Sequence, residues 1–413
     1  MAPRYTAPKG TFDVLGPRSA RYAALVARFA DHAARSGYDL LVQPMFEDVE
    51  VFQRMGASTD VVRKEMYDFE DKGGRHVALR PEGTASAVRA YLEHHPTPPW
   101  KIWYAGPKFR YERPQKGRYR QHHEVGIEAI GTADPDLDVE VIALASAFYA
   151  DLGLRRLTLR LTSLGDSVCR PPYRQALHEY LSARRDELCA EHADRVGDNP
   201  LRILDCKRDA CIAAAEAAPR LLDNLCEDCD AHFTRVRAGL DAAGIAYDID
   251  RSLVRGLDYY TRTTFEFAAL ALDAAQNAAG GGGRYDGLVE ELGGPVTPGI
   301  GFGLGIERIL DACDAEGVFP EPTDRLDVFV IDTTGGAAAR DATLLLRAAG
   351  VRADRSFDGR SWKAQMKEAQ RSGARFAVSI DADGMTVRTL TEKGEPQPVT
   401  AVTLVDSILE RLQ

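Results

Sequence analysis

The sequence lacks several features that would place it in a special structural class. The apolar run Val141–Ala150 is too short to cross a bilayer, which needs about 20 residues, and Met1–Thr6 contains no apolar core of a signal peptide. Seven cysteines, an odd number spread over 413 residues, argue against a disulfide framework and for a reducing compartment. We therefore expect a cytoplasmic protein without a membrane partner.

Positive charge is also in deficit. The chain has 52 Lys and Arg against 62 Asp and Glu, a net charge of −10, so a nucleic-acid partner would have to be bound by local basic patches. Hydrophobic residues at 45% and charged residues at 28% exclude collagen-like, coiled-coil and wholly disordered chains. At ~150 residues per domain, the length suggests about two or three domains.

Residue periodicity divides the chain into parts. A helix is predicted where Tyr22, Leu25, Val26 and Phe29 recur at helical spacing, and strand-like segments follow through residue 130. Residues 166–237 are helix-rich and predict an inserted subdomain. Beyond Pro322, strands alternate with helices, which predicts a separate α/β unit. We expect domains at 1–322 and 323–413, with the insertion lying inside the first.

The densest charge pattern lies between Lys108 and Arg120, with six basic residues and one acidic residue. Lys116–Gly117 predicts a turn between two strands. A guanidinium held on a strand at Arg110, together with further cations on the loop, suits a polyphosphate ligand. The alternative is a solvated hairpin, the usual interpretation of an isolated charge run.

Two glycine-containing runs provide weaker signals. Gly303–Arg308 predicts a strand that enters a helix, with Arg308 in the first helical turn. Arg255–Tyr260 places two tyrosines after a glycine-containing turn. Neither run is a dinucleotide-binding or P-loop pattern, so neither identifies a function by itself.

Together these segments resemble a known family, the class II aminoacyl-tRNA synthetases, and among them the histidyl-tRNA synthetases. The motifs that carry the resemblance occur in order along the chain: Pro8–Asp13, Arg80–Thr84, Phe109–Gln121, Leu253–Tyr260, Gly282–Leu288 and Gly303–Arg308. The run Arg255–Tyr260 is the most specific, and the resemblance covers essentially the whole chain.

The resemblance implies a fold and an activity. The fold is an α+β catalytic domain built on a six-stranded antiparallel sheet (the class II synthetase fold) with a helical insertion, followed by a C-terminal α/β anticodon-binding domain. The activity is ATP- and Mg²⁺-dependent activation of L-histidine and its transfer to tRNA(His). A homodimer is implied, with the helix before Gly37 and the strand ending at Pro44 in its interface.

The resemblance also implies residue roles. Arg110 and Arg255 would face the α-phosphate from opposite sides, and Arg308 would contact the γ-phosphate. Other ATP contacts would come from Glu112, Arg113 and His122, the last by stacking on adenine. Histidine would be bound by Glu82, Thr84 and Glu124 at its ammonium and by Glu128 and Tyr260 at its imidazole, with Tyr259 and Tyr285 nearby. The tRNA contacts would be Lys116, Arg118, Tyr119, Arg120, Lys363 and Lys367.

This chemistry is physically consistent. A carboxylate attacking the α-phosphorus is already ionised, so the reaction needs alignment and charge neutralisation rather than a general base. Guanidinium groups remain charged at any working pH. A site that hydrogen-bonds both imidazole nitrogens would reject other side chains by roughly 10⁴-fold.

The cysteines leave two interpretations open. The pairs Cys206/Cys211 and Cys226/Cys229 lie close together in the insertion, which is consistent with one structural zinc site or with four ordinary thiols. Cys169, Cys189 and Cys313 are isolated in the sequence and are expected to be core or surface residues.

Two other functions compete. One is a non-catalytic paralogue resembling a regulatory subunit of histidine biosynthesis, but such paralogues lack the final domain. The other is a class II ligase for proline, threonine or glycine, which the tyrosine pair Tyr259–Tyr260 after Arg255–Gly256 disfavours.

Overall fold

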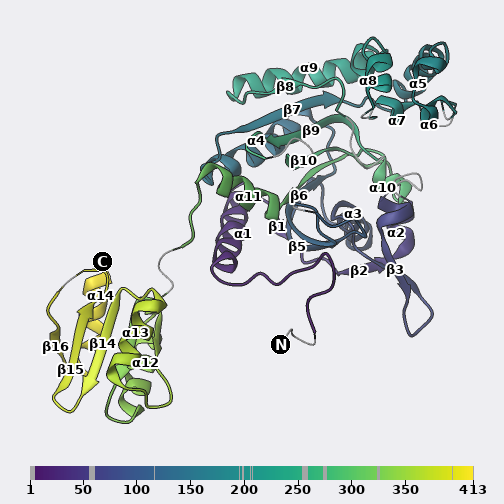
Figure 1. Cartoon of the computed structure of the whole chain (residues 1–413). Helices are drawn as coiled ribbons and strands as arrows, with labels where there is room; N and C mark the ends of the chain where they lie inside the picture. The colour runs from purple at the N-terminus through teal and green to yellow at the C-terminus, as the bar shows by residue number, and fades with distance from the viewer. Residues whose placement is uncertain are drawn as a thin grey trace. The chain divides into compact units, whose positions relative to one another are not determined.

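A computed structural model describes residues 5–54, 61–115, 117–194, 196–197, 200–204, 206, 208–253, 259–272, 277–322, 326–392 and 394–412. The chain divides into two compact units, Met1–Pro320 and Glu321–Gln413. Each unit has its own sheet and its own hydrophobic core (Figure 1).

The main sheet of the first unit has eight strands in the order β1-β5-β6-β11-β10-β9-β7-β8. Their bounds are β1 Asp39–Leu40, β5 Trp100–Phe109, β6 Gln121–Ile130, β7 Leu157–Ser163, β8 Asp248–Ile249, β9 Thr261–Ala269, β10 Ala278–Arg284 and β11 Gly299–Gly305.

The expectation of a six-stranded antiparallel sheet is therefore wrong, because the sheet is eight-stranded and mixed. The six central strands pair antiparallel, while β1 and β8 add one short parallel strand at each edge. Parallel neighbours need a long crossover, and the chain supplies one in each case. The whole helical insertion separates β7 from β8, and a small sheet with two α-helices separates β1 from β5. Two-residue strands have no periodicity that the sequence could reveal.

One face of the main sheet is packed against helices, and the other, which we call the open face, is only partly covered. Alternate residues of β6 and β11, such as Ile127 and Phe302, enter a core with four helices. These helices are α1 Arg18–Arg35, α4 Pro135–Asp151, α9 Glu227–Ala242 and α11 Ile306–Glu316. Because side chains alternate along a strand, the intervening residues, among them Glu124, Gly126 and Glu128, lie on the opposite face.

A smaller layer adjoins that opposite face. It contains a three-stranded antiparallel sheet of β2 Phe46–Asp48, β4 His76–Leu79 and β3 Tyr67–Glu70. Helices α2 Val49–Gln53, α3 Thr84–His94 and α10 Leu288–Glu291 accompany it. Its apolar cluster includes Phe52, Val88, Tyr259, Tyr260 and Tyr285, so the tyrosines of two sequence motifs meet here.

The insertion contains short helices around a separate core. They are α5 Arg170–Ser182, α6 Ala190–Ala193, α7 Leu201–Leu204 and α8 Asp209–Ala215, with Leu177, Leu181 and Ile203 buried between them. The next helix, α9, extends beyond residue 237, and its Phe233, Val236 and Leu240 belong to the core of the main sheet.

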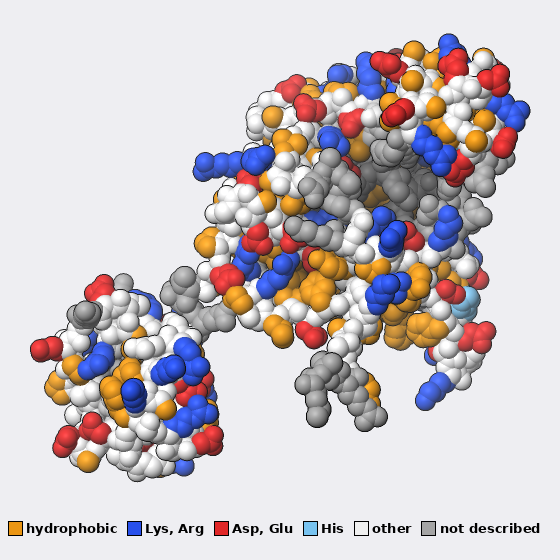
Figure 2. Space-filling model, in the orientation of Figure 1, with side chains coloured by type: hydrophobic (Ala, Val, Ile, Leu, Met, Phe, Trp, Pro, Cys, Tyr) orange, Lys and Arg blue, Asp and Glu red, His pale blue; other side chains and the backbone are white. Residues whose placement is uncertain are grey.

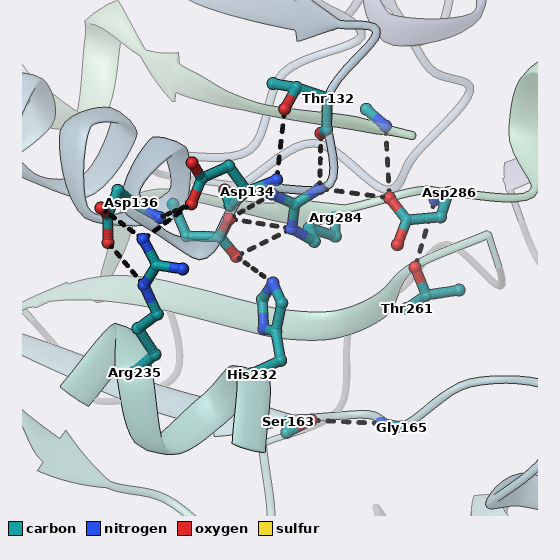
Figure 3. A network of polar contacts seen from close by, with 12 residues as sticks. Thr132, Asp134, Asp136, Ser163, Gly165, His232, Arg235, Thr261, Arg284 and Asp286 are labelled. Atoms are coloured by element: carbon teal, nitrogen blue, oxygen red, sulfur yellow. Dashed lines mark hydrogen bonds and ion pairs between the residues drawn. The ribbon is translucent and has the colours of Figure 1, made fainter. Parts of the chain in front are cut away.

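A buried arginine ties the sheet to α4 (Figure 3). Arg284, at the end of β10, is fully buried and donates to both carboxylate oxygens of Asp138 and to the carbonyls of Thr132 and Asp134. Asp286 accepts from the backbone N–H of Gly299 at 3.2 Å. This network therefore holds the backbone on both sides of Tyr285.

The second unit is a five-stranded sheet in the order β13-β12-β14-β15-β16. Its elements are β12 Val328–Asp332, α12 Ala337–Ala348, β13 Ala353–Arg355, α13 Trp362–Ser372, β14 Phe376–Asp381, β15 Gly384–Thr389, β16 Gln397–Val399 and α14 Leu404–Leu412. The alternation of strands and helices produces a parallel centre, β13-β12-β14, with an antiparallel edge. In the part of the chain that the structure describes, every helix is too short or too polar to span a bilayer.

Candidate active site

The open face of the main sheet has a floor of glycines. Gly301, Gly303 and Gly305 of β11 pair with Glu128, Gly126 and Glu124 of β6, and Gly281 and Gly283 of β10 continue the row. A side chain at Gly301 would overlap with the Glu128 carboxylate and with the Ile127 carbonyl. Gly301 thus makes room for the Glu128 carboxylate, whereas Gly281, Gly303 and Gly305 line the space above the sheet.

A cavity of about 260 Å³ lies over this floor. It is lined by Arg110, Glu112, Gly117, Arg118, Tyr119, His122, Glu124, Tyr260, Ala278, Ala279, Gly280, Gly281, Gly303, Gly305, Glu307 and Arg308. Residues from three separate sequence motifs thus share one space. Its three arginines suit the anionic part of a ligand, and its three glutamates suit a cationic part.

Two arginines of the cavity are held by backbone carbonyls. Arg110 donates Nε to Pro81 O at 2.9 Å, and Arg308 donates Nε to Gly117 O at 3.0 Å and Nη1 to Ala278 O at 2.9 Å. Burial, together with the neighbouring charges of Arg118 and Arg110, lowers the pKa of Arg308, but an arginine stays protonated. The carbonyls fix the guanidinium positions before a ligand arrives.

The predicted hairpin forms around Gly117, where Gln115 and Arg118 form an isolated bridge. Within it, Arg118 pairs with the buried carboxylate of Glu112, and Tyr119 packs on Phe12 with ring centroids 4.8 Å apart. Arg120 does not line the cavity and lies over the Tyr111 ring at 3.8 Å.

On β6, His122 and Glu124 point toward the cavity and hydrogen-bond each other at 3.3 Å. Burial alone would raise the pKa of Glu124. The hydrogen bond and charge of His122 and the charges of Lys108 and Arg110 outweigh burial and lower this pKa to about 2. Glu124 is therefore an anion at neutral pH.

Glu128 lies in a buried network next to the cavity. Its Oε1 accepts from Thr84 Oγ1 at 2.8 Å and from Tyr104 OH at 3.2 Å, and its Oε2 accepts from Tyr285 OH at 2.7 Å. Burial raises the pKa of Glu128 to about 8, and these hydrogen bonds only partly oppose it. The network adjoins the cavity through Tyr260, whose ring centroid is 4.8 Å from that of Tyr259.

Glu82 lies at the start of α3 in the same layer. Its carboxylate accepts the backbone N–H groups of Thr84 at 2.6 Å and Ala85 at 2.9 Å, and Tyr259 OH at 3.4 Å. Burial raises the pKa of Glu82. In this structure the carboxylate caps the helix, which satisfies its orphan N–H groups.

The structure brings together much, but not all, of the predicted site. The residues that line the cavity are Arg110, Glu112, Arg118, Tyr119, His122, Glu124, Tyr260 and Arg308. Those in the adjoining network are Glu82, Thr84, Glu128, Tyr259 and Tyr285. Arg113 is exposed and Arg120 is half-buried, and neither lines the cavity. Arg255 and Lys116 lie outside the described residues.

Sequence reasoning missed three residues of this region. Glu307 lines the cavity and accepts from His123 Nδ1 at 2.7 Å, Tyr104 donates to Glu128, and Lys108 is fully buried with its Nζ 4.5 Å from the Tyr104 ring centroid. Burial lowers the pKa of Lys108 to about 8. The alternation of β5 could have placed Tyr104 and Lys108 on one face, since they are four residues apart.

The second unit places Lys363 and Lys367 on one exposed side of α13, which begins at the exposed Trp362. On the face shown in Figure 2, basic and acidic side chains are interspersed over this unit.

The cysteines do not form the single four-cysteine site considered above. Cys206 and Cys211 gather with Cys189 and His192, whereas Cys226 and Cys229 gather with Asp166 and Cys169. Cys206 and Cys211 belong to the separate core of the insertion, whereas Cys226 and Cys229 lie at the start of α9. Cys169 and Cys189, isolated in the sequence, are thereby brought to the pairs.

Comparisons with known proteins identify one family. The family model described as histidyl-tRNA synthetase matches residues 10–309. The chain is 49% identical over 386 residues to a histidine–tRNA ligase of Desulforudis audaxviator (91% of this chain, 90% of that protein). It is 48% identical over 419 residues to one of Mycobacterium bovis (99% and 98%). The solved apo histidyl-tRNA synthetase of S. aureus superposes with a TM-score of 0.81 at 36% identity, covering 98% of this chain and 99% of that one.

Proposed function

The chain belongs to the histidyl-tRNA synthetase family, and we propose that it acts as a histidine–tRNA ligase. It activates L-histidine with ATP to histidyl-adenylate, releases pyrophosphate, and transfers histidine to the 3′ end of tRNA(His). The observation that carries the proposal is the cavity in which two carbonyl-anchored arginines face the same space as Tyr260, next to the buried Glu128 network.

The first step forms a bond between a histidine carboxylate oxygen and the α-phosphorus, while the bond from that phosphorus to the bridging oxygen of pyrophosphate breaks. We assign Arg110 to the α-phosphate and Arg308 to the γ-phosphate. Their anchoring by carbonyls supports this role, because preorganised charges need not reorient as negative charge develops. Arg255 is assigned to the opposite side of the α-phosphate, and Glu112, Arg113 and His122 to the nucleotide.

Imidazole recognition is assigned to Glu128 and Tyr260. A carboxylate has about four lone-pair sites, and three are used, two on Oε1 and one on Oε2. The remaining site on Oε2 can accept an imidazole N–H, and the Tyr260 phenol can bind the other ring nitrogen. A hydrogen bond to the ionised carboxylate favours that form, so histidine binding would lower the raised pKa of Glu128.

The histidine ammonium is assigned to Glu124, with Glu82 and Thr84 on the same side of the site. The low pKa of Glu124 supports this role, because the group keeps its negative charge at every physiological pH. Family members act with Mg²⁺, and the cavity carboxylates Glu112 and Glu307 suit a hard cation that prefers oxygen ligands together with phosphates. When bound, Mg²⁺ would neutralise charge on the phosphates.

The remaining roles concern larger partners. The division of the chain at residue 320 supports assigning residues 1–322 to catalysis, with the insertion 166–237 inside them, and residues 323–413 to the anticodon. Exposed Lys363 and Lys367 beside Trp362 suit single-stranded RNA, and Lys116, Arg118, Tyr119 and Arg120 are assigned to the acceptor end. We place the reaction in the cytoplasm, a reducing compartment that suits cysteines outside disulfides.

A homodimer is assigned to the surface that follows α1. Leu40, Val42, Met45 and Phe46 are all exposed within seven consecutive residues. Exposed apolar side chains concentrated in one segment suit an interaction site. Sedimentation equilibrium of the full chain should give twice the mass of one chain.

The function is tested by amino-acid-dependent exchange of pyrophosphate into ATP, with histidine compared against proline, threonine and glycine. Histidine alone should support exchange. Arg110→Lys should lower kcat by at least about tenfold, since a lysine cannot bind a phosphate bidentately from the same position. Arg235→Lys, on an exposed ion pair with Asp136, is the matched control. ATP binding without histidine-dependent exchange would instead favour the regulatory paralogue.

A further inference from the structure

We propose that the helical insertion binds two structural zinc ions, one at Cys189, His192, Cys206 and Cys211 and the other at Asp166, Cys169, Cys226 and Cys229. Within each group, one ligand atom from every residue lies within 4.8 Å of the others. Four ligands around zinc at the Zn–S distance of ~2.3 Å are ~3.8 Å apart in a tetrahedron. Both groups therefore need only a small contraction to bind the ion.

The first site lies at the core of the insertion, where Cys211 is buried and Cys189 and Cys206 pack against it. His192 Nδ1 lies 3.2 Å from Cys189 Sγ and 3.6 Å from Cys211 Sγ. Cys189 and His192 are separated by two residues, the short spacing typical of one half of a zinc site. Three thiolates and one imidazole form a Cys₃His set, which is a known structural zinc composition.

The second site joins the two points at which the chain enters and leaves the insertion. Asp166 and Cys169 follow β7, while Cys226 and Cys229 lie at the start of α9. Cys226 Sγ is 3.9 Å from Asp166 Oδ1. Three thiolates and a carboxylate complete the tetrahedral set, and both residue pairs have two-residue spacing.

Backbone N–H groups and arginine side chains donate hydrogen bonds to the proposed ligands of each site. At the first site, the Cys189 backbone N–H donates to Cys211 Sγ at 3.4 Å, and Arg208 Nη1 donates to Cys189 Sγ at 3.1 Å. At the second site, the Cys226 N–H donates to Cys169 Sγ at 3.1 Å, and Arg262 pairs with Asp166 at 3.5 Å. Such outer contacts orient ligands and offset the net negative charge of a site with three thiolates.

The second site also connects to the cavity. Arg170, one residue after Cys169, donates to the carbonyl of Tyr260. The Arg262 N–H donates to Gly165 O at 2.7 Å, next to Asp166. A zinc ion that fixes Asp166 and Cys169 would therefore also fix the backbone of Tyr260. Among the described residues, the first site has no hydrogen bond to a residue of the cavity.

The test is the zinc content of the full chain, purified without chelator and dialysed against buffer, measured by mass spectrometry. We expect two zinc ions per chain. X-ray absorption at the zinc edge should give an average of three sulfur ligands and one nitrogen or oxygen ligand per zinc. A content of zero or one, an average of four sulfurs, or iron in place of zinc would overturn the proposal.

Paired variants assign the sites. Cys189→Ser with Cys211→Ser should remove one zinc, and Cys226→Ser with Cys229→Ser should remove the other. The control is Cys313→Ser, a buried thiol of the main core that belongs to neither group and should leave both ions. If a variant does not fold, the absorption data on the unmodified chain still decide the ligand sets.

The link to the cavity has its own readout. The second-site variant should raise the KM for histidine several-fold and leave the KM for ATP nearly unchanged, whereas the first-site variant should change neither. An unchanged KM for histidine after loss of the second zinc would overturn the positioning role. Because zinc content is measured without any reaction, failure of the metal sites is distinguishable from failure of the proposed ligase activity.

Discussion

Alanine substitutions at Gly301 and at Gly305, two glycines of β11, should have different effects on stability and on substrate binding. An alanine Cβ at position 301 would lie well under 3.0 Å from both the Glu128 carboxylate and the Ile127 carbonyl oxygen. Neither neighbour can yield freely, since the carbonyl belongs to β6 and the carboxylate is held by three hydroxyl groups. By contrast, a Cβ at Gly305 meets no heavy atom within 4 Å.

The expected cost follows from this geometry. Overpacking usually destabilises by ~1–3 kcal/mol, and the upper end applies to Gly301→Ala because both contacts are rigid. Unfolding entropy of ~2.1 cal/mol/K per residue over the 320 residues of the first unit gives ~0.7 kcal/mol/K. Gly301→Ala should therefore lower the Tm by about 4 °C, while Gly305→Ala should leave it within ~1 °C.

The kinetic expectation differs between the two variants. Displacing Glu128 removes a charged hydrogen bond to histidine, a loss of ~1.5–3 kcal/mol, so Gly301→Ala should raise the KM for histidine at least about tenfold. Gly305→Ala adds its methyl to the cavity floor near Arg308 and should raise mainly the KM for ATP. Calorimetry and pyrophosphate exchange measure both effects. A Gly301→Ala protein with the original Tm and KM for histidine would refute the packing of Glu128 against β11 and its assigned role.

Three further outcomes are expected. At pH 7.5, histidine binding should release protons, because the pKa of Glu128 starts at about 8 and falls when its carboxylate accepts an N–H. Titration calorimetry in buffers of different ionisation enthalpy measures this release. Glu128→Gln should abolish the release and weaken the binding of histidine more than that of ATP, and equal weakening of both would contradict the assignment. The pKa of Glu128 in the folded protein is above its unfolded value of ~4.3, so the stabilising contribution of Glu128 is complete at low pH and is lost as pH rises toward 8. The Tm should therefore fall more steeply between pH 5 and 8 in the unmodified chain than in Glu128→Gln. Parallel slopes would contradict the raised pKa. Arg284→Met leaves Asp138 buried without its arginine partner, which should lower the free energy of unfolding in urea by ~3–5 kcal/mol. Adding Asp138→Leu to Arg284→Met should restore much of that free energy. No restoration would show that the carbonyl contacts of Arg284 provide the stability instead.

The site was predictable where chemistry follows from residue type and local order. The run from Lys108 to Arg120 indicated a basic hairpin from charge and a Lys–Gly turn, and Gly303–Arg308 indicated a strand entering a helix; the structure confirms the hairpin, β11 and α11. Resemblance to the family then joined these segments into one site. The individual roles of the site residues remain predictions.

The sequence could not show which hydrogen-bond partners each buried carboxylate has in the folded protein. Glu82 and Glu128 are recognisable as motif residues, but their carboxylates are occupied by a helix start and by three hydroxyl groups from distant segments. The low pKa of Glu124 and the raised pKa of Glu128 likewise depend on burial and on neighbours across the sheet. Two carboxylates four residues apart on one strand thus acquire opposite properties.

By itself, the sequence determined the family, the main helices and strands, and the types of charge available for chemistry, because these depend on residue identity and on spacing along the chain. Only the tertiary structure decided the edges of the sheet, the two separate cysteine groups and the partners of each buried carboxylate. These features depend on contacts between residues that are distant in the chain, and folding alone sets the distances between them.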